Sequence, residues 1–251
     1  KISTADIIIS KHPIKLNYKI KRLTEKNVIN LKKKDFFTPI KSSRDAYIIF
    51  TSGSTGEPKG VRISRISLNN YIKYITKKIF NDKIIRCSQH ASIGFDLSVA
   101  DIYGTICSNG TLYPIKGDYN KLFLNKFIKK FKLTHWVSVP SAIDIITENK
   151  FCEKNDLNIL KKMFFCGEIL KKINLEKIFK KNEKIEVINA YGPTEATVSC
   201  TDIKLNRNNF RKYCKPTVAI GRPIKGVQFS VNKIHKKTNY GEIVITGSQV
   251  S

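Results

Sequence analysis

Short apolar runs alternate with amphipathic stretches along the chain from residue 47 onward. The run 47–51 has the length and composition of a buried strand. The stretch 64–80 places apolar side chains at helical spacing on one face and has hydroxyl residues near its start, which predicts a helix. The same reasoning predicts further strands at 84–88, 111–115, 134–139, 163–166 and 185–189, and further helices at 99–106, 120–131, 141–149 and 170–181.

This alternation predicts an α/β fold with a doubly wound, mostly parallel sheet. Ligands in such folds bind beyond the carboxyl ends of the strands. Four segments with polar or glycine residues stand at or just after predicted strands, and we therefore expect them to meet at one site. They are the segments 51–60, 95–98, 166–168 and 190–195.

The pattern changes after Glu195. Segments at 198–205, 227–231 and 242–246 read as β-strands separated by polar turns, which predicts a smaller β-rich portion. We therefore expect three parts, namely the end of a preceding subdomain at 1–46, an α/β core at 47–200 and the β-rich portion at 201–251.

The segment 51–60 reads TSGSTGEPKG and is the most informative stretch of the chain. Its glycines let the backbone approach a polyphosphate, and its hydroxyls and N–H groups can donate hydrogen bonds to phosphate oxygens. Lys59 adds a mobile positive charge. The spacing excludes a Walker P-loop, because Pro58 stands where that motif requires its second glycine. The alternative is a polar surface loop before a helix.

The same segment resembles the phosphate loop of the adenylate-forming (AMP-binding) superfamily, and later segments resemble further motifs of these enzymes in the same order. They are FDLS at 95–98, NAYGPTE at 189–195, IGRP at 220–223 and GEIVITG at 241–247. The resemblance implies the fold of the N-terminal core of these enzymes, with ATP and the substrate bound in the part 47–200. It also implies a reaction that joins a carboxylate to the α-phosphate of ATP and releases pyrophosphate.

Within the superfamily the chain resembles amino-acid adenylation domains. The stretches FDLSVADIY (95–103) and FFCGEIL (164–170) are similar to ligases that load D-alanine onto a carrier protein. The resemblance therefore implies adenylation of a small amino acid, with D-alanine expected, and transfer to the phosphopantetheine thiol of an acyl or peptidyl carrier protein. Two alternatives stay open: a nonribosomal peptide synthetase domain for another small amino acid, or a truncated, non-catalytic nucleotide-binding core.

The resemblance assigns catalytic roles to Lys59, Thr194 and Glu195. Thr194 would contact the α-phosphate, and Glu195 would bind Mg²⁺ because a carboxylate suits a hard cation. The alternative for Glu195 is a favourable charge at a helix N-terminus. Tyr191 would stack on adenine. The full set expected to bind nucleotide is Thr51, Ser52, Gly53, Ser54, Thr55, Gly56, Lys59, Gly167, Glu168, Asn189, Ala190, Tyr191, Gly192 and Thr194.

By the same resemblance, Asp96 would pair with the α-ammonium group of the substrate. A carboxylate in an apolar pocket binds an amine strongly and rejects fatty acids that lack it. The alternative is that Asp96 caps a helix. Cys166 is expected to pack rather than to act as a nucleophile, because no motif places a histidine beside it. The remaining residues expected to line the pocket are Leu97, Ala100, Ser138, Phe164, Cys166, Ala190, Val198 and Ser199.

The formal net charge is +26, with 46 basic against 20 acidic residues. The lysines are scattered in pairs and triplets and no nucleic-acid-binding motif accompanies them, so we expect no nucleic-acid partner. A basic surface could steer an acidic carrier protein. The six cysteines form no Cys-x-x-Cys pair, which favours a reducing, cytoplasmic location over a zinc site or disulfides.

No apolar run approaches the ~20 residues that span a bilayer, so we expect no membrane insertion. Members of the superfamily usually have a longer N-terminal part, and they continue into a ribose-binding aspartate, a hinge and a C-terminal lid with a catalytic lysine. This comparison predicts that the chain is the core of an adenylation domain, with weak or absent turnover by itself.

Overall fold

The computed structural model describes residues 7–9, 21–23, 45–52, 57–148, 156–233 and 240–251. The chain divides into two compact units, Lys1–Lys41 and Ser42–Ser251, and each is described by itself. In the first unit, β1 (Ile7–Ile9) pairs in parallel with β2 (Lys21–Leu23). All other elements belong to the second unit.

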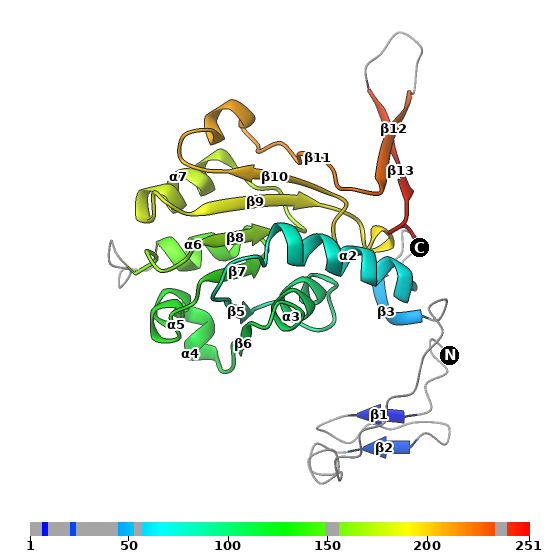
Figure 1. Ribbon diagram of the computed structural model, residues 1–251, viewed down its shortest axis with the longest axis horizontal. Coiled ribbons are helices and arrows are strands. Elements are labelled where there is room, and N and C mark those ends of the chain that lie inside the picture. Colours follow the sequence, from blue (N-terminus) through cyan, green and yellow to red (C-terminus); the bar gives the residue numbers. More distant parts are fainter. Residues whose placement is uncertain (1–6, 10–20, 24–44, 53–56, 149–155, 234–239) are drawn as a thin grey trace. The chain divides into compact units, whose positions relative to one another are not determined.

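A seven-stranded sheet forms the centre of the second unit (Figure 1). Its strand order is β11-β10-β9-β8-β7-β5-β6. Strands β5 to β9 run parallel, whereas β10 and β11 are antiparallel to their neighbours, which confirms the mostly parallel sheet. The strands are β5 (Arg86–Gln89), β6 (Thr111–Pro114), β7 (His135–Ser138), β8 (Lys162–Phe165), β9 (Glu186–Tyr191), β10 (Thr201–Leu205) and β11 (Arg222–Pro223).

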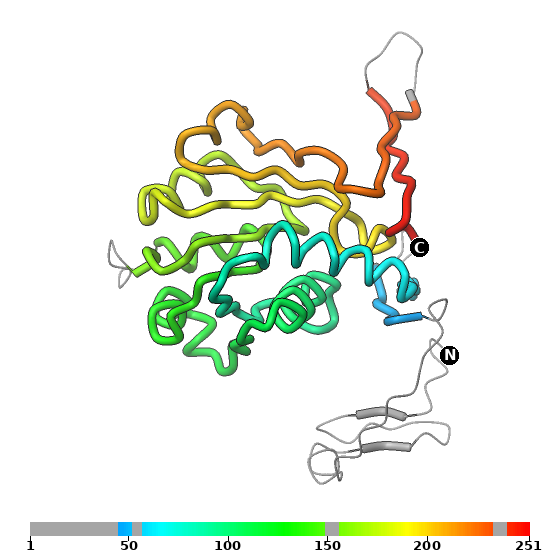
Figure 2. Tube along the Cα trace, in the orientation of Figure 1, coloured from blue at the N-terminus to red at the C-terminus, as the bar shows by residue number. Residues whose placement is uncertain are grey.

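Helices cover both faces of this sheet, as the doubly wound prediction requires (Figure 2). Side chains alternate between the two faces along β8: Met163 and Phe165 pack with α5, α6 and α7, whereas Phe164 packs with α2 and α3. The helices are α2 (Arg65–Lys78), α3 (Leu97–Ile106), α4 (Asp118–Leu122), α5 (Leu124–Lys130), α6 (Ala142–Thr147) and α7 (Lys172–Lys181).

The sequence explains where α2 begins and which face it buries. Ser64 caps the helix, its hydroxyl accepting a hydrogen bond from the Ser67 N–H at 3.1 Å. Leu68, Tyr71 and Ile75 recur at helical spacing and are buried against the sheet. The predicted helix at 64–80 is therefore confirmed.

The helix expected at 120–131 is instead two short helices, α4 and α5. Phe123 separates them, with a backbone of φ −120° and ψ 55° that lies outside the helical region. Apolar periodicity continues across this residue, so the pattern could not show the break. The prediction of one continuous helix was wrong.

Two hairpins stand apart from the main sheet. β3 (Asp45–Ser52) pairs antiparallel with β4 (Pro58–Ser64), and β12 (Val227–Lys233) pairs antiparallel with β13 (Gly241–Gly247). The predicted strand at 47–51 exists, but it lies in a hairpin rather than in the parallel sheet. Pro58, Lys59 and Gly60, which were expected in a loop, belong to β4.

The predicted range 201–251 contributes to two sheets. β10 and β11 join the main sheet beside β9, whereas β12 and β13 pair only with each other. Ala196, Cys200, Ile224 and Val227 form a small buried cluster that connects the end of the sheet to β12. The division of the chain at residue 200 stays a prediction. Among the described residues, no helix is long and apolar enough to cross a membrane.

Candidate active site

The carboxyl ends of β8 and β9 meet the start of α3 at one edge of the main sheet. Cys166 directly follows β8, Tyr191 ends β9, and Asp96 immediately precedes α3. The 3₁₀ turn Thr194–Ala196 (η1) follows β9 by two residues. Three of the four segments predicted to carry the site are therefore brought to the same edge, as the parallel strand order requires.

The fourth segment approaches from the β3–β4 hairpin. Gly53, Ser54, Thr55 and Gly56 and the side chain of Ser52 lie outside the described residues, so the phosphate-loop assignment stays a prediction. Lys59 is described: it lies opposite Thr51 in the hairpin, and it is exposed. Strand β4 lies against η1, which brings the strand of Lys59 to the turn that carries Thr194 and Glu195.

Asp96 does not cap α3 with its side chain, although it occupies the N-cap position. Burial raises the pKa of its carboxyl group, a hydrogen bond from the Thr194 side chain lowers it, and the charge of Glu195 raises it again. The net shift is upward, and no cationic side chain among the causes offsets the burial. Among the described residues no cation is found to offset the burial of this carboxylate, and a ligand ammonium group would supply one.

The apolar residues predicted to line the pocket share one buried cluster with α2. Ser199 is also fully buried, and its hydroxyl lies 3.5 Å from the Tyr71 hydroxyl. Burial raises the pKa of the Cys166 thiol to about 12, which excludes a thiolate nucleophile near neutral pH and agrees with a packing role. The cluster contains Leu97, Ala100, Phe164, Cys166, Ala190 and Val198.

A loop with a strained backbone carries the pocket residues Val198 and Ser199. Thr197 and Val198 have φ values of 57° and 70°, a region that β-branched residues rarely adopt. The loop folds back so closely that a Cβ on Gly192 would stand 2.6 Å from Ser199 Cα. Glycine is thus required at 192. The tight turn places Val198 and Ser199 beside the end of β9.

Among the residues expected to bind nucleotide, Tyr191 and Gly167 differ from Glu168 and Asn189, whose side chains already form hydrogen bonds within the protein. The Tyr191 side chain is 38% exposed at the end of β9 and is available for stacking, and Gly167 has a φ of 96°. Glu168 and Asn189 already have protein partners. The Glu168 carboxylate accepts bonds from the Ser141 N–H and hydroxyl at 2.9 and 3.2 Å, and the Asn189 amide donates to the Ala219 carbonyl at 3.0 Å.

Ser138 is not brought together with the other predicted pocket residues. Its hydroxyl accepts a hydrogen bond from the Trp136 indole at 2.8 Å and donates to the Val139 carbonyl at 2.9 Å. Trp136 belongs to the core on the opposite face of the sheet from Cys166. Because side chains alternate along a strand, Val137 and Val139 face the pocket side instead.

Two tyrosines near Asp96 were absent from the sequence-based set. Tyr47 lies on β3, and its buried hydroxyl has no hydrogen-bond partner among the described residues. Burial raises the pKa of Tyr47, and the neighbouring charge of Asp96 adds to the rise. Tyr71 lies on α2 and is fully buried. The only sequence signal for Tyr71 was a hydroxyl-bearing ring on the apolar face of a predicted helix.

The exposed Glu195 carboxylate fits a magnesium ion that is held mainly by phosphates. Glu195 is exposed on η1, and no group of three His, Cys, Asp or Glu residues that could hold a metal is found in the described part of the chain. Mg²⁺ in phosphoryl-transfer sites is commonly bound by one or two carboxylates together with substrate oxygens. Glu195 can provide such a carboxylate.

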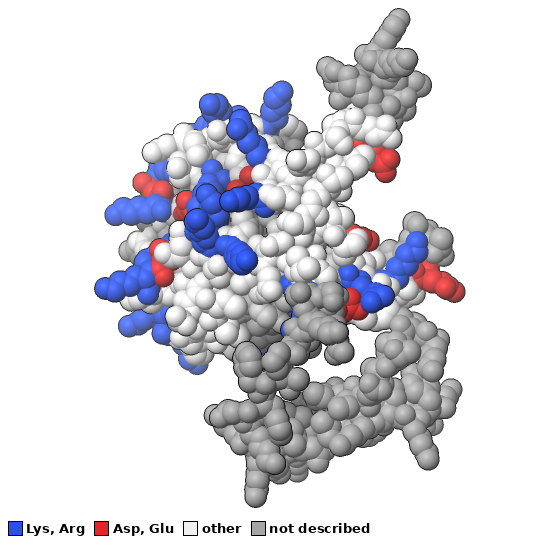
Figure 3. Space-filling view, turned by 45° about the vertical axis from the view of Figure 1, so that its right-hand side comes forward, with Lys and Arg blue, Asp and Glu red and all other residues white. Residues whose placement is uncertain are grey.

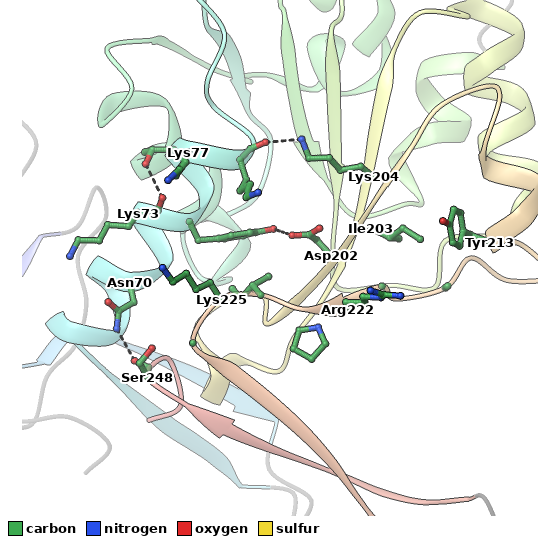
Figure 4. Close-up of a pocket in the computed structure, with 18 residues that line it drawn as sticks. Asn70, Lys73, Lys77, Asp202, Ile203, Lys204, Tyr213, Arg222, Lys225 and Ser248 are labelled. Carbon is green, nitrogen blue, oxygen red and sulfur yellow. Dashed lines mark hydrogen bonds between the residues drawn. The ribbon is translucent and has the colours of Figure 1, made fainter.

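The basic residues are not concentrated at this edge. Lys and Arg side chains are scattered over the face shown in Figure 3. A separate cavity of about 1440 Å³ lies between α2 and the β10–β11 side of the sheet (Figure 4). Its single acidic residue, Asp202, accepts a hydrogen bond from Tyr74. The cations that line it are Lys73, Lys77, Lys78, Lys204, Arg222 and Lys225.

Comparison with known proteins gives a consistent result. The family model described as "AMP-binding enzyme" matches residues 4–251. The D-alanine–D-alanyl carrier protein ligase of Listeria monocytogenes serotype 4b (strain F2365) is 33% identical over 218 residues, which cover 84% of this chain and 42% of that protein. The ligase of the same name from Staphylococcus epidermidis is 35% identical over 218 residues, covering 86% and 43%. The chain thus spans less than half the length of these relatives.

A solved structure shows the same fold. The Vibrio cholerae adenylation domain AlmE, in complex with glycyl-adenosine-5′-phosphate, superimposes with a TM-score of 0.73 at 29% identity. The match covers 92% of this chain and 44% of that one.

Proposed function

The chain belongs to the AMP-binding enzyme family, which matches almost its whole length, and from this premise we propose that it activates a small amino acid with ATP. The products would be an aminoacyl-adenylate and pyrophosphate. The observation that supports the proposal most directly is Asp96, a half-buried carboxylate with a raised pKa that lies beside Thr194 and Glu195 and has no cationic partner in the part of the chain that the structure describes.

The reaction brings two anions together, so positioning and charge neutralisation must supply most of the catalysis. A carboxylate oxygen of the amino acid attacks the α-phosphorus of ATP. The new carboxyl–phosphate bond forms as the bond from the α-phosphorus to the bridging oxygen breaks, and pyrophosphate leaves with that electron pair. Asp96 would hold the ammonium group, and Thr194 would orient the α-phosphate.

Lys59 and Glu195 are suited to the charge of the leaving group. Lys59 extends from β4, which lies against η1, and its ammonium would bind the β- and γ-phosphates next to the predicted phosphate loop. Mg²⁺ bound at Glu195 would neutralise phosphate charge. Tyr191, exposed at the end of β9, would stack on the adenine ring.

The substrate that we favour is D-alanine, and the acceptor is a carrier-protein thiol. The curated relatives carry this name and share about a third of their residues with the chain. The pocket side of the sheet is narrowed by Phe164 and Cys166, both almost fully buried, which suits a short side chain. A nonribosomal peptide synthetase domain for another small amino acid is the second candidate, because AlmE was solved with a glycyl adenylate.

The test is amino-acid-dependent ATP–pyrophosphate exchange, measured on the complete encoded polypeptide with D-alanine, L-alanine, glycine, β-alanine, serine and a fatty acid. Exchange with D-alanine alone would support the ligase proposal, and loading of a phosphopantetheinylated carrier protein would complete it. Exchange with another amino acid would keep the adenylation mechanism and discard D-alanine. ATP-dependent thermal stabilisation without any exchange would favour the non-catalytic core.

A further inference from the structure

The hydroxyl of Tyr71 lies beside Ser199, a residue predicted to line the amino-acid pocket, although Tyr71 comes from a helix that carries none of the predicted pocket residues. Its ring is fully buried in the cluster that contains Cys166, Ala190 and Val198. The Ser199 hydroxyl donates to the Tyr71 oxygen at 3.5 Å, which is at the long limit for a hydrogen bond.

The surroundings of this hydroxyl place it near the ammonium-binding carboxylate. Burial raises the pKa of Tyr71 well above its ordinary value, and the neighbouring charges of Cys166 and Asp96 add to the rise. The phenol therefore remains protonated at physiological pH. Within the described part of the chain no acceptor takes the phenolic proton, so Tyr71 keeps one donor while Ser199 occupies one acceptor position.

Tyr71 differs from its neighbour Tyr74, one turn further along α2. The two rings are 6.0 Å apart, but the Tyr74 hydroxyl donates to Asp202 in the basic cavity. Tyr74 is thus directed away from the pocket and its hydroxyl is satisfied by a strong acceptor. One helix therefore presents two phenols, one to Ser199 and the cluster of predicted pocket residues, and one to the cavity.

We infer that Tyr71 is a specificity-determining residue, which closes the buried end of the amino-acid pocket and, together with Ser199, limits the substrate to a short side chain. This inference rests on the proposed amino-acid activation. Both the size and the apolar character of a longer substrate side chain would exclude it. A longer side chain would have to displace a packed ring, and it would also place methylene groups against two hydroxyls.

The experiment compares two Tyr71 variants with a control on the same helix. Tyr71→Phe removes only the hydroxyl, Tyr71→Leu shortens the side chain as well, and Tyr74→Phe removes the hydroxyl that faces the cavity. Exchange kinetics would be measured with glycine, alanine, 2-aminobutyrate and norvaline, in the enantiomeric series that the unmodified protein prefers. The kcat/KM of each amino acid is then divided by that of alanine.

We expect Tyr71→Leu to raise the ratio of 2-aminobutyrate or norvaline to alanine by about 10-fold or more, because one methylene in an apolar pocket commonly changes discrimination 10- to 200-fold. Tyr71→Phe should shift the ratio in the same direction by about 2- to 5-fold, and Tyr74→Phe should leave it unchanged. The KM for ATP should stay constant in all three, and the change should be in the KM for the amino acid.

The inference is overturned if folded, active Tyr71 variants keep the ratios of the unmodified protein, or if Tyr74→Phe shifts them equally. If Tyr71→Leu does not fold, the isosteric Tyr71→Phe decides alone. Failure of the unmodified protein to exchange with any amino acid would be a different result, because it would overturn the proposed function and the inference would fall with it.

Discussion

The two edges of the parallel strands carry aspartates in opposite situations. At the amino ends, Asp82 contacts Lys162 at 2.8 Å and the buried His135 at 3.2 Å. Burial raises the pKa of Asp82, but Lys162, His135 and Lys161 outweigh it and the net shift is downward. At the carboxyl ends, Asp96 has a raised pKa, and no cation within the described ranges offsets its burial.

Asp82 therefore belongs to a cluster of charges that stabilises the fold, whereas Asp96 is available to bind a ligand. Asp82 is satisfied by the protein, and the buried His135 receives a further contact from the Thr134 hydroxyl at 2.9 Å. Asp96 accepts hydrogen bonds from Thr194 and from backbone N–H groups, but no cation is among the groups that shift its pKa, so a substrate ammonium group could still gain interaction energy there. Charge at one edge supports the fold, and charge at the other edge is available for function.

The largest expected effect is the loss of exchange in Asp96→Ala. Removing the partner of a partly buried ammonium group should lower kcat/KM for the amino acid about 10³-fold. The melting temperature should stay the same or rise slightly, because a carboxylate with a raised pKa opposes folding above its ordinary titration range. The measurement is ATP–pyrophosphate exchange beside a thermal melt.

Asp118→Ala is the matched control for that experiment, since Asp118 is exposed and forms only a surface ion pair with Lys121 at 3.7 Å. Equal losses of exchange in the two variants would contradict the role of Asp96.

For Asp82→Ala, at the amino ends of the parallel strands, we expect a loss of stability without a loss of exchange. Asp82→Ala leaves Lys162 with its bonds to the Ile79 carbonyl and to Asn81, but it removes the counter-charge. Breaking such a partly buried pair should lower the free energy of unfolding by about 2–3 kcal/mol. Exchange per folded molecule should be unchanged. Urea unfolding measures the loss of stability, and exchange measured well below the melting temperature reports activity separately. A loss of activity without destabilisation would contradict the assignment of Asp82 to the stabilising cluster.

The same cluster predicts that acid lowers stability. Burial lowers the pKa of His135 from 6.5 to about 4, although Asp82 opposes the shift, whereas the unfolded chain takes up the proton below about 6.5. The contribution of His135 to stability is therefore complete above pH 6.5 and is lost as the pH drops through the folded value. Its slope approaches about 1.4 kcal/mol per pH unit, so this contribution falls by about 1–2 kcal/mol between pH 6.5 and 5. The raised pKa of Asp101, about 8, contributes with the opposite sign in this range, so the His135 contribution is read as the difference between the unmodified protein and a His135 variant.

Denaturant melts at several pH values test this expectation. The lowered pKa of Asp82 acts only at still lower pH. His135→Asn is less stable in itself but should flatten the dependence. A slope that persists in that variant would assign the acid sensitivity to another group.

The smallest expected effect concerns lysines on α2 that lie at neither the amino ends nor the carboxyl ends of the parallel strands. Lys73 and Lys77 stand on the face of α2 that lines the basic cavity (Figure 4). If an acidic carrier protein is steered by this surface, Lys73→Glu combined with Lys77→Glu should raise the KM for the carrier about 3- to 10-fold at low salt and less at high salt. Exchange without the carrier should not change. If carrier loading does not change, the lysines of the cavity are ordinary solvated side chains and do not steer the carrier protein.

The order of the motifs and the strand–helix alternation could be predicted from residues alone. Asp96, Thr194 and Glu195 were assigned by resemblance to family motifs, and their segments independently follow predicted strands, whose carboxyl ends parallel order brings together. The hairpin of β3 and β4 could not be predicted in this way. Its second strand, Pro58–Ser64, begins within a glycine-rich segment whose composition is typical of a loop.

Side-chain direction caused the clearest difference between prediction and structure. Ser138 is one residue away from two positions that face the pocket side, and a one-residue difference in a strand reverses the face. Tyr71 was overlooked for a related reason. Its spacing from Leu68 and Ile75 is that of one helix face, but periodicity cannot say which buried groups that face meets.

The sequence by itself determined the alternating elements, the positions of the polar segments at strand ends and the family to which the chain belongs. These properties depend on local periodicity and on residue types at fixed spacing, which are present in the linear chain. Tertiary structure alone decided that Asp82 has cationic partners while Asp96 has none among the residues that the structure describes, and that Tyr71 meets Ser199 across 128 residues. Burial and pairing arise from contacts between distant segments, and a pKa shift or a pocket wall exists only after those contacts form.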